Sequence, residues 1–530
     1  MFIHWVAVNR VTVHTIIEKQ PVEAVNTGAK AKGAVLYSAR TKIYPKRVQG
    51  QFRRLKWIIM VVTLAIYYVT PWLRWDRGPY APNQAVLIDI AHRRFYFFFI
   101  EIWPQEFFYI AGLLVMAGVG LFLVTSVVGR AWCGYSCPQT VWTDLFIAVE
   151  QYFEGDRNAR IKLEAAPWSL RKVTLRLLKH ASWVLIAIAT GGAWIFYFAD
   201  APTLLTSFLT GQAPLVAYAT VGVLTATTYV FGGLMREQVC IYMCPWPRIQ
   251  AAMLDEDSLV VTYNDWRGEP RSHGSKKAAA QGIASGDCVD CNACVAVCPT
   301  GIDIRNGQQM ECITCALCID ACDNIMDRLE KPRGLISYST LRDYNHNVAL
   351  AKDANGAIIP NRIRNASGVF VDAVKHFDWH VFLRPRTLLY VSLWSSIGIA
   401  MLYFLVTRDR LRLDVQHDRN PIAVKLSDGS IRNGYTVKLL NMVQEPRAII
   451  LSLQGLPGAT MTIAELKDTS GRSTVIEVEP DKLRALHVFI SQPPQMLRAG
   501  QTPFTISVND PQSFEADHYN AQFEVPGTSQ

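Results

Sequence analysis

Two identically spaced runs of cysteine constrain the fold of this chain most strongly. Eight of its 12 cysteines lie between Cys288 and Cys322, in the segments CVDCNACVAVCP and CITCALCIDAC. Each segment has the spacing C-x2-C-x2-C-x3-C, which is typical of proteins that hold two cubane iron–sulfur clusters. Three thiolates on a tight loop bind one face of a cubane, and the fourth ligand comes from elsewhere. The chain is therefore predicted to contain two [4Fe–4S] clusters.

In bacterial two-cluster ferredoxins the fourth cysteine of each run binds the other cluster, and this exchange gives the predicted ligand sets. The first set is Cys288, Cys291, Cys294 and Cys322, and the second is Cys312, Cys315, Cys318 and Cys298. Zinc is the rival metal, but structural zinc sites typically use two CxxC pairs for each ion. Two identical runs of four favour clusters. The second run continues into Asp323, where such motifs usually have proline, and this departure affects a turn rather than the ligands.

Five apolar runs without charged residues approach the ~20 residues that a helix needs to cross a bilayer. They are 57–73, 107–128, 181–198, 213–234 and 388–406. Charged residues make up 18% of the chain, below the roughly 25% of soluble proteins. The predicted fold class is a multi-domain membrane protein with an α-helical bundle of about five spans, an α+β two-cluster ferredoxin-like domain and a C-terminal all-β domain.

Lysine and arginine in the flanks predict the orientation in a bacterial inner membrane. The segment KRVQGQFRRLK precedes the first run and 130–180 is also basic, whereas DAPTLLTSFLTGQ has neither Lys nor Arg. This pattern predicts a cytoplasmic N-terminus and ferredoxin domain and a periplasmic C-terminal domain, although four arginines in 74–106 oppose it. The net charge of +9 is explained by this orientation rather than by nucleic-acid binding. Residues 1–20 lack the features of a cleavable signal peptide, and a start codon assigned too early is an alternative origin for them.

The tail beyond residue 407 contains short β-rich runs such as GYTVKLLN, RAIILSLQGL and RALHVFISQ, separated by turn residues. Six or seven strands of this kind predict a sandwich of immunoglobulin type, here without a cysteine pair. The predicted division is an N-terminal segment 1–56, membrane helices in 57–250, a linker 251–284, the ferredoxin-like domain 285–330, a second linker 331–387, the last span 388–406 and the periplasmic domain 407–530.

The remaining cysteines form two copies of the motif C-x3-C-P. Cys133 and Cys137 lie in GRAWCGYSCPQTVW, and Cys240 and Cys244 lie in MREQVCIYMCPWPR. Each copy follows an apolar run that is predicted to end on the cytoplasmic side, so the four thiols are expected to converge on one metal site at the membrane surface. Soft thiolates suit Cu(I), and a further sulfur-ligated centre or inert buried thiols are the alternatives. Arg130 and Arg236 are expected to lower the pKa of these thiols.

These motifs, the intervening spans and the β-rich tail resemble the CcoG/FixG/RdxA family from about residue 35 onward. The family consists of accessory proteins for cbb-type cytochrome c oxidase, with an immunoglobulin-like C-terminal domain. The resemblance implies reduction of Cu(II) to Cu(I), with oxidase assembly factors or copper chaperones as partners. The spacing of the cysteines indicates redox chemistry and metal ligands but does not by itself indicate copper.

Three functions follow. The first is a membrane metal reductase, in which the clusters supply electrons to copper at the C-x3-C-P thiols from a donor that the sequence does not identify. The second is a quinol-oxidising subunit without copper, with a quinone site near Glu101 and Glu106 in an interfacial or re-entrant segment, FYFFFIEIWPQEFF. The third is an assembly scaffold with structural clusters.

Overall fold

The computed structural model describes residues 42–526, apart from 80, 272–285, 354–358, 360–362, 364–369, 376–377, 379–381, 467–469 and 481. Most of the predicted N-terminal segment, including 1–20, and part of the first linker lie outside the described residues. The chain divides into two compact units. One comprises Met1–Val69, Leu113–Ile195 and Gly211–Ser395, and the other comprises Thr70–Gly112, Phe196–Thr210 and Ser396–Gln530.

Within the described residues, five helices are long and apolar enough to cross a membrane, as predicted. They span Gln51–Trp72, Pro104–Val128, Leu170–Ile195, Leu215–Met235 and Pro385–Val406, and their main segments are α2 (Gln51–Val69), α3 (Phe108–Val128), α7 (Leu170–Ile195), α9 (Leu215–Thr228) and α16 (Pro385–Val406). Helices α2 and α7 begin well before the charge-free runs. Arg and Lys are good helix formers with apolar stems, so an apolar run marks only the central part of such a helix. Helix α9 continues into a π-helix, η3 (Tyr229–Met235).

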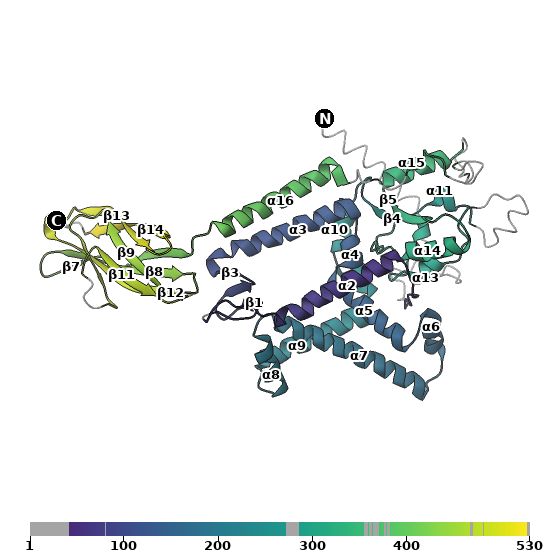
Figure 1. The fold of residues 1–530 in the computed structure, drawn as a ribbon, viewed down its shortest axis with the longest axis horizontal. Helices are drawn as coiled ribbons and strands as arrows, with labels where there is room; N and C mark the ends of the chain where they lie inside the picture. The colour runs from purple at the N-terminus through teal and green to yellow at the C-terminus, as the bar shows by residue number, and fades with distance from the viewer. Residues whose placement is uncertain are drawn as a thin grey trace, which may run out of the picture. The chain divides into compact units, whose positions relative to one another are not determined.

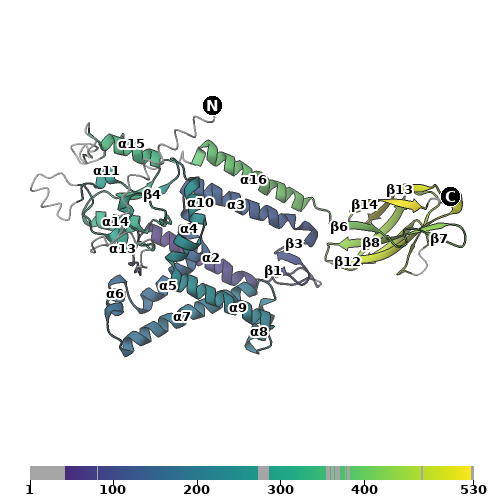
Figure 2. The same cartoon turned by 180° about the vertical axis from the view of Figure 1, so that it is seen from behind.

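The cysteine runs lie on a small α+β fold within the first unit. Helices α13 (Ala293–Val297) and α14 (Leu317–Arg328) pack beside the antiparallel strands β4 (Val260–Tyr263) and β5 (Ile336–Ser339) (Figures 1 and 2). These strands, with α11 (Asp265–Gly268) and α15 (Leu341–Ala351), fall in the two segments predicted to be linkers. Those segments are therefore partly folded, because the cysteine loops need apolar side chains such as Val261 and Ile336 to complete their core.

Short helices around the membrane spans carry the C-x3-C-P motifs. The first motif lies on α4 (Ala131–Tyr135) and the start of α5 (Pro138–Phe153), which leads into α6 (Arg157–Ala165). The second lies on the π-helix η4 (Val239–Met243), which is followed by α10 (Trp246–Met253). A proline follows each motif and begins or precedes a helix, a position where its missing amide hydrogen is tolerated.

The second unit begins with a short turn of helix, η1 (Thr70–Trp72), and a three-stranded antiparallel sheet of β1 (Val86–Asp89), β2 (Arg94–Phe97) and β3 (Ile100–Ile102). A turn, η2 (Pro104–Glu106), and helix α8 (Ala201–Leu209) also belong to this unit. The segment expected to be interfacial or re-entrant forms β2, β3 and η2. Buried Arg77 stabilises the sheet by donating hydrogen bonds to the carbonyl oxygens of Gln84, Ala85 and Phe98.

The C-terminal region is an all-β sandwich, as predicted. One sheet has the order β10–β12–β8–β6 with β7 paired to β8, and the other has the order β11–β9–β13–β14. The strands are β6 (Leu411–His417), β7 (Val424–Lys425), β8 (Ile431–Asn441), β9 (Arg447–Gln454), β10 (Thr460–Ile463), β11 (Ser473–Val478), β12 (Lys482–Gln492), β13 (Gly500–Asn509) and β14 (Ala516–Val525). Alternate side chains of β8 are buried: Tyr435, Val437 and Leu439 belong to the apolar core of the sandwich, and Asn433 and Asn441 are buried polar side chains.

Candidate metal centres

The structure brings the first predicted ligand set together around one cavity. Cys288, Cys291, Cys294 and Cys322 all line one small cavity. Cys294 lies on α13 and Cys322 on α14, so the packing of these two helices brings a cysteine of the second run to the first. Apolar side chains, including Met326 and Leu335, line the rest of the cavity.

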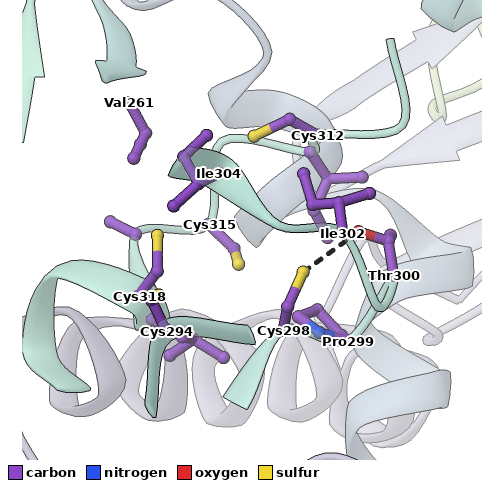
Figure 3. A pocket seen from close by; sticks show the side chains of 13 residues that line it. Val261, Cys294, Cys298, Pro299, Thr300, Ile302, Ile304, Cys312, Cys315 and Cys318 are labelled. Carbon is purple, nitrogen blue, oxygen red and sulfur yellow. Dashed lines mark hydrogen bonds between the residues drawn. The ribbon is translucent and has the colours of Figure 1, made fainter. Parts of the chain in front are cut away.

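The second predicted ligand set lines a second, small cavity. Its cysteines are Cys298, Cys312, Cys315 and Cys318, and Cys294 of the first set also lines it. In Figure 3 the sulfur atoms of Cys298 and Cys315 face one another across this space. The Cys298 Sγ and Thr300 Oγ1 atoms form a hydrogen bond of 3.2 Å. The crossed arrangement of the two runs is therefore present in the fold.

The backbone repeats itself in the two runs in a way that fits a cubane. Asp290 and Asn292 flank Cys291 with positive φ angles of 51° and 56°, and Thr314 and Ala316 flank Cys315 with 54° and 60°. Such left-handed residues turn successive amide groups inward and make a concavity that suits an anionic iron–sulfur cluster. Both cavities thus combine the four cysteines of a predicted ligand set with left-handed turns and largely apolar walls.

Burial controls the protonation of these thiols. It raises the pKa of Cys294 and of Cys312 to about 12. Arg305 lowers the pKa of Cys294, and the Thr314 amide lowers that of Cys312, but burial has the larger effect. At neutral pH the metal-free thiols are therefore protonated, and binding of a metal or cluster has to displace the protons. Soft thiolates in such apolar surroundings fit iron–sulfur clusters, which supply one-electron chemistry when bound.

The structure also brings the two C-x3-C-P motifs close to each other. Cys133 is within electrostatic range of Cys137, Cys240 and Cys244. Its Sγ donates a hydrogen bond of 3.1 Å to Oε1 of Gln250, a fully buried residue on the helix that follows the second motif. Among the described residues, no group of three His, Cys, Asp or Glu side chains is close enough together to bind a single metal ion. This is true of the C-x3-C-P cysteines and of the cysteines around the two ferredoxin-like cavities.

The two arginines of the motifs have different roles. Arg130 is buried, and its charge lowers the pKa of Cys133 and Cys240. The burial of these two thiols has the larger effect and raises their pKa to about 12 and about 11. The expected lowering of the pKa is therefore wrong for the metal-free thiols. Arg236 instead donates to Oε2 of Glu150 at 2.7 Å and to the carbonyl oxygen of Gly233. Its charge is used in a buried ion pair rather than for the cysteines.

A direct contact between the first C-x3-C-P motif and the second cysteine run could not be read from the sequence. A Cβ atom on Gly134 would lie 2.6 Å from the Ile313 carbonyl oxygen and 3.0 Å from Cα of Cys315. The adjacent Tyr135 donates a hydrogen bond to the Cys315 carbonyl oxygen at 3.1 Å. Cys133 and Cys315 belong to one apolar cluster. The glycine inside the motif is the only sequence signal of this close approach.

The two glutamates considered for a quinone site are both paired with arginine. Arg94 lies 3.4 Å from Oε1 of Glu101, and Arg408 lies 2.9 Å from Oε2 of Glu106. Glu106 also accepts a hydrogen bond from the backbone amide of Trp103. Burial raises the pKa of Glu101 against the opposing effect of Arg94. These contacts fix the turn before α3, which is a structural role.

Comparison with known proteins agrees with this domain arrangement. Residues 235–341 match the family described as a 4Fe-4S dicluster domain, residues 110–150 match a 4Fe-4S binding domain, and residues 401–526 match the IG-like fold at the C-terminal of FixG. The second match contains Cys133 and Cys137, and the first contains the other ten cysteines. The C-terminal sandwich is therefore immunoglobulin-like, and the chain is an iron–sulfur protein.

Three curated proteins are similar over most of their lengths. The nitrogen fixation protein FixG of Rhizobium meliloti (strain 1021) is 64% identical over 508 residues, which cover 96% of this chain and 97% of that protein. Protein RdxA of Cereibacter sphaeroides is 54% identical, covering 81% of this chain and 85% of RdxA, and RdxB is 53% identical, covering 85% and 92%. With these identities and the matching domains, the chain belongs to the FixG/RdxA family of iron–sulfur membrane proteins.

Proposed function

We propose that this iron–sulfur electron-transfer protein reduces Cu(II) to Cu(I) at the thiols of its two C-x3-C-P motifs. Cys288, Cys291, Cys294 and Cys322 would hold one [4Fe–4S] cluster, and Cys298, Cys312, Cys315 and Cys318 the other. Each cluster supplies one electron at a time, and each Cu(II) ion takes up one electron. The copper is the substrate and leaves as Cu(I), which soft thiolates prefer.

The observation that carries this proposal is the contact of the first C-x3-C-P motif with the second cysteine run. The Tyr135 hydroxyl bonds to the backbone of Cys315, and Gly134 packs on the same residue. A metal held by Cys133 would therefore be close to a cluster ligand. Arg130 acts on Cys133, Cys240 and Cys312, so its buried positive charge favours thiolate at both sites.

The proposed location is the inner membrane, with the cysteine sites in the cytoplasm and the immunoglobulin-like domain in the periplasm. The basic flanks of the first and third spans support this orientation. The reducing cytoplasm also keeps thiols available for metals. The resemblance to oxidase accessory proteins supports assembly factors of a cbb-type oxidase, or copper chaperones, as recipients of Cu(I).

The test is Cu(II) reduction by the full-length protein, purified anaerobically and reduced chemically, with Cu(I) trapped by a chromogenic chelator after excess reductant has been removed. We expect roughly one Cu(I) for each cluster electron, because both couples exchange single electrons. The double variant Cys133→Ser/Cys240→Ser should keep its iron and lose copper binding and rapid reduction. Ser136→Ala, in the same loop but without a ligand sulfur, is the matched control.

The other two functions predict different results in this and two further measurements. A quinol-oxidising subunit would have its clusters reduced by quinol and would not require Cys133 or Cys240. A scaffold with structural clusters would keep its effect on oxidase assembly after its clusters can no longer be reduced. Unchanged copper binding and reduction in the double variant would show that these cysteines do not handle copper.

A further inference from the structure

The two cysteine cavities differ in their surroundings. Cys291 of the first cavity is exposed, whereas the other seven ferredoxin-type cysteines are buried or partly buried. The second cavity adjoins the first through Cys294, which lines both, and adjoins the C-x3-C-P motif through Cys315. The order in space is therefore the first cavity, which has the exposed cysteine, then the second cavity and then the C-x3-C-P thiols.

A buried lysine lies next to the second cavity. Lys56, on α2, is only 2% exposed, although it lies in a basic flank that would ordinarily be solvated. Its Nζ atom is 3.8 Å from Oδ1 of Asp144. Arg53 contacts both oxygens of the same carboxylate, at 2.9 and 3.0 Å. Arg53 and Lys56 therefore place two positive charges beside Asp144, and the carboxylate of Asp320 lies at the start of the same helix.

The position of Lys56 is fixed by the attachment of α2 to the second cysteine run. The carboxylate of Asp320 on α14 accepts hydrogen bonds from the amides of Phe52 and Arg53, at 3.2 and 2.7 Å. The Phe52 ring packs on Tyr338, whose hydroxyl donates to the carbonyl oxygen of Thr314 at 2.9 Å. Thr314 directly precedes Cys315. The start of this membrane helix is therefore bound to the loop that carries the second ligand set.

The charges at the two cavities are unequal. Lys56 is the charged side chain with the largest electrostatic effect on Cys315, and Asp144 has a weaker effect of opposite sign. At the first cavity the cation that acts on Cys294 is Arg305, which is paired with Asp303 and Asp290. Asp323 further disfavours negative charge at Cys322. The second cavity is therefore the more favourable place for an added electron.

We propose that Lys56 sets the order of the two reduction potentials, so that an electron on the protein resides on the cluster of the second cavity, next to the C-x3-C-P thiols. Reduction adds negative charge to a cluster, and a buried cation stabilises that charge with little screening by solvent. Delivery of the electron to copper rests on the proposed function, whereas the order of the potentials does not.

The experiment is a redox titration of the full-length protein, followed by electron paramagnetic resonance without copper. The signals are assigned with Cys291→Ser, which alters a ligand of the first cluster only. Lys56→Met should lower the midpoint potential of the second cluster and leave the first unchanged, and Lys56→Arg should restore it. Arg54→Gln removes a charge from the exposed side of the same helix turn and should shift neither potential.

Unchanged potentials in Lys56→Met with a full iron content, or a shift confined to the first cluster, would overturn the proposal. Wild-type protein reduced by one electron gives a test without any Lys56 variant. The electron should appear in the signal that Cys291→Ser leaves unaltered, and its appearance on the other cluster would also overturn the proposal. If the wild-type protein fails to reduce Cu(II) but the potentials have this order, the proposed function fails and the role of Lys56 stands.

Discussion

The hydroxyl group of Tyr135 donates a hydrogen bond of 3.1 Å to the carbonyl oxygen of Cys315. The bond joins a residue inside the first C-x3-C-P motif to a predicted cluster ligand 180 positions away in the sequence. Tyr135 thus holds the peptide group that follows Cys315. Tyr338 holds the peptide group that precedes it, by donating a hydrogen bond to the carbonyl oxygen of Thr314. Two sites that the sequence presents as separate motifs are one packed assembly.

Tyr135→Phe should slow the oxidation of the reduced protein by Cu(II) several-fold without loss of iron. The variant leaves the buried Cys315 carbonyl without this partner, at a cost of about 1–3 kcal/mol, and loosens the contact between the two sites. Stopped-flow absorbance of the clusters measures the rate. Tyr152→Phe on α5 is the control, because Tyr152 is 79% exposed. Equal rates for both variants and the wild type would contradict this role of Tyr135.

The anaerobically purified protein should contain about eight iron and about eight acid-labile sulfide per chain, since two cubanes hold four of each. Cys291→Ser should damage mainly the cluster of the first cavity, and Cys315→Ser mainly that of the second. Metal analysis and spectra of the oxidised and reduced protein measure both effects. Stoichiometric zinc without iron would contradict the assignment.

Reporter fusions should place the cysteine sites and the β-sandwich on opposite sides of the membrane. A fusion after Glu330 is expected to report cytoplasm, and one at Gln530 is expected to report periplasm, because α16 (Pro385–Val406) lies between them. Each fusion is made with a reporter active only in the cytoplasm and with one active only in the periplasm. If both positions report the same compartment, α16 does not cross the membrane.

Leu439→Ala should destabilise the immunoglobulin-like domain by about 2–5 kcal/mol, because it leaves a cavity in a closely packed core. Leu439 is completely buried in β8. Val475→Ala, at a side chain that is 62% exposed, should change the stability by no more than about 0.5 kcal/mol. Limited proteolysis across a temperature series compares the two. Cluster content should be unchanged in both, and loss of iron in Leu439→Ala would show that the sites depend on this domain.

Short sequence patterns were sufficient to predict those parts of the fold that depend on neighbouring residues in the chain. Apolar runs gave the five membrane helices, and alternating β-rich runs gave the strands of the sandwich. Cysteine spacing and the exchange known from two-cluster ferredoxins predicted two sets of four cysteines, and the structure places the members of each set around one cavity. Helix starts were misjudged where basic side chains continue the helix, as at Leu170.

Contacts between distant segments could not be predicted in this way. Lys56 and Arg236 have similar sequence surroundings, a basic residue beside an apolar run, yet one lies near Cys315 and the other pairs with Glu150. Only the packing of helices against each other decides which carboxylate a buried cation meets. The two linkers were missed as folded segments for a similar reason, since β4 and β5 are each four residues long and pair across more than 70 positions.

The exchange of the fourth cysteine between the two runs has a consequence for biosynthesis. Cys322, which lines the first cavity, is the last cysteine of the second run, and Cys298 of the first run lines the second cavity. A ribosome that has synthesised only the first run has therefore produced neither complete site. The flanking strand β5 follows later still, at Ile336–Ser339. On the predicted ligand sets, neither site has all four of its cysteines until most of this segment has been synthesised.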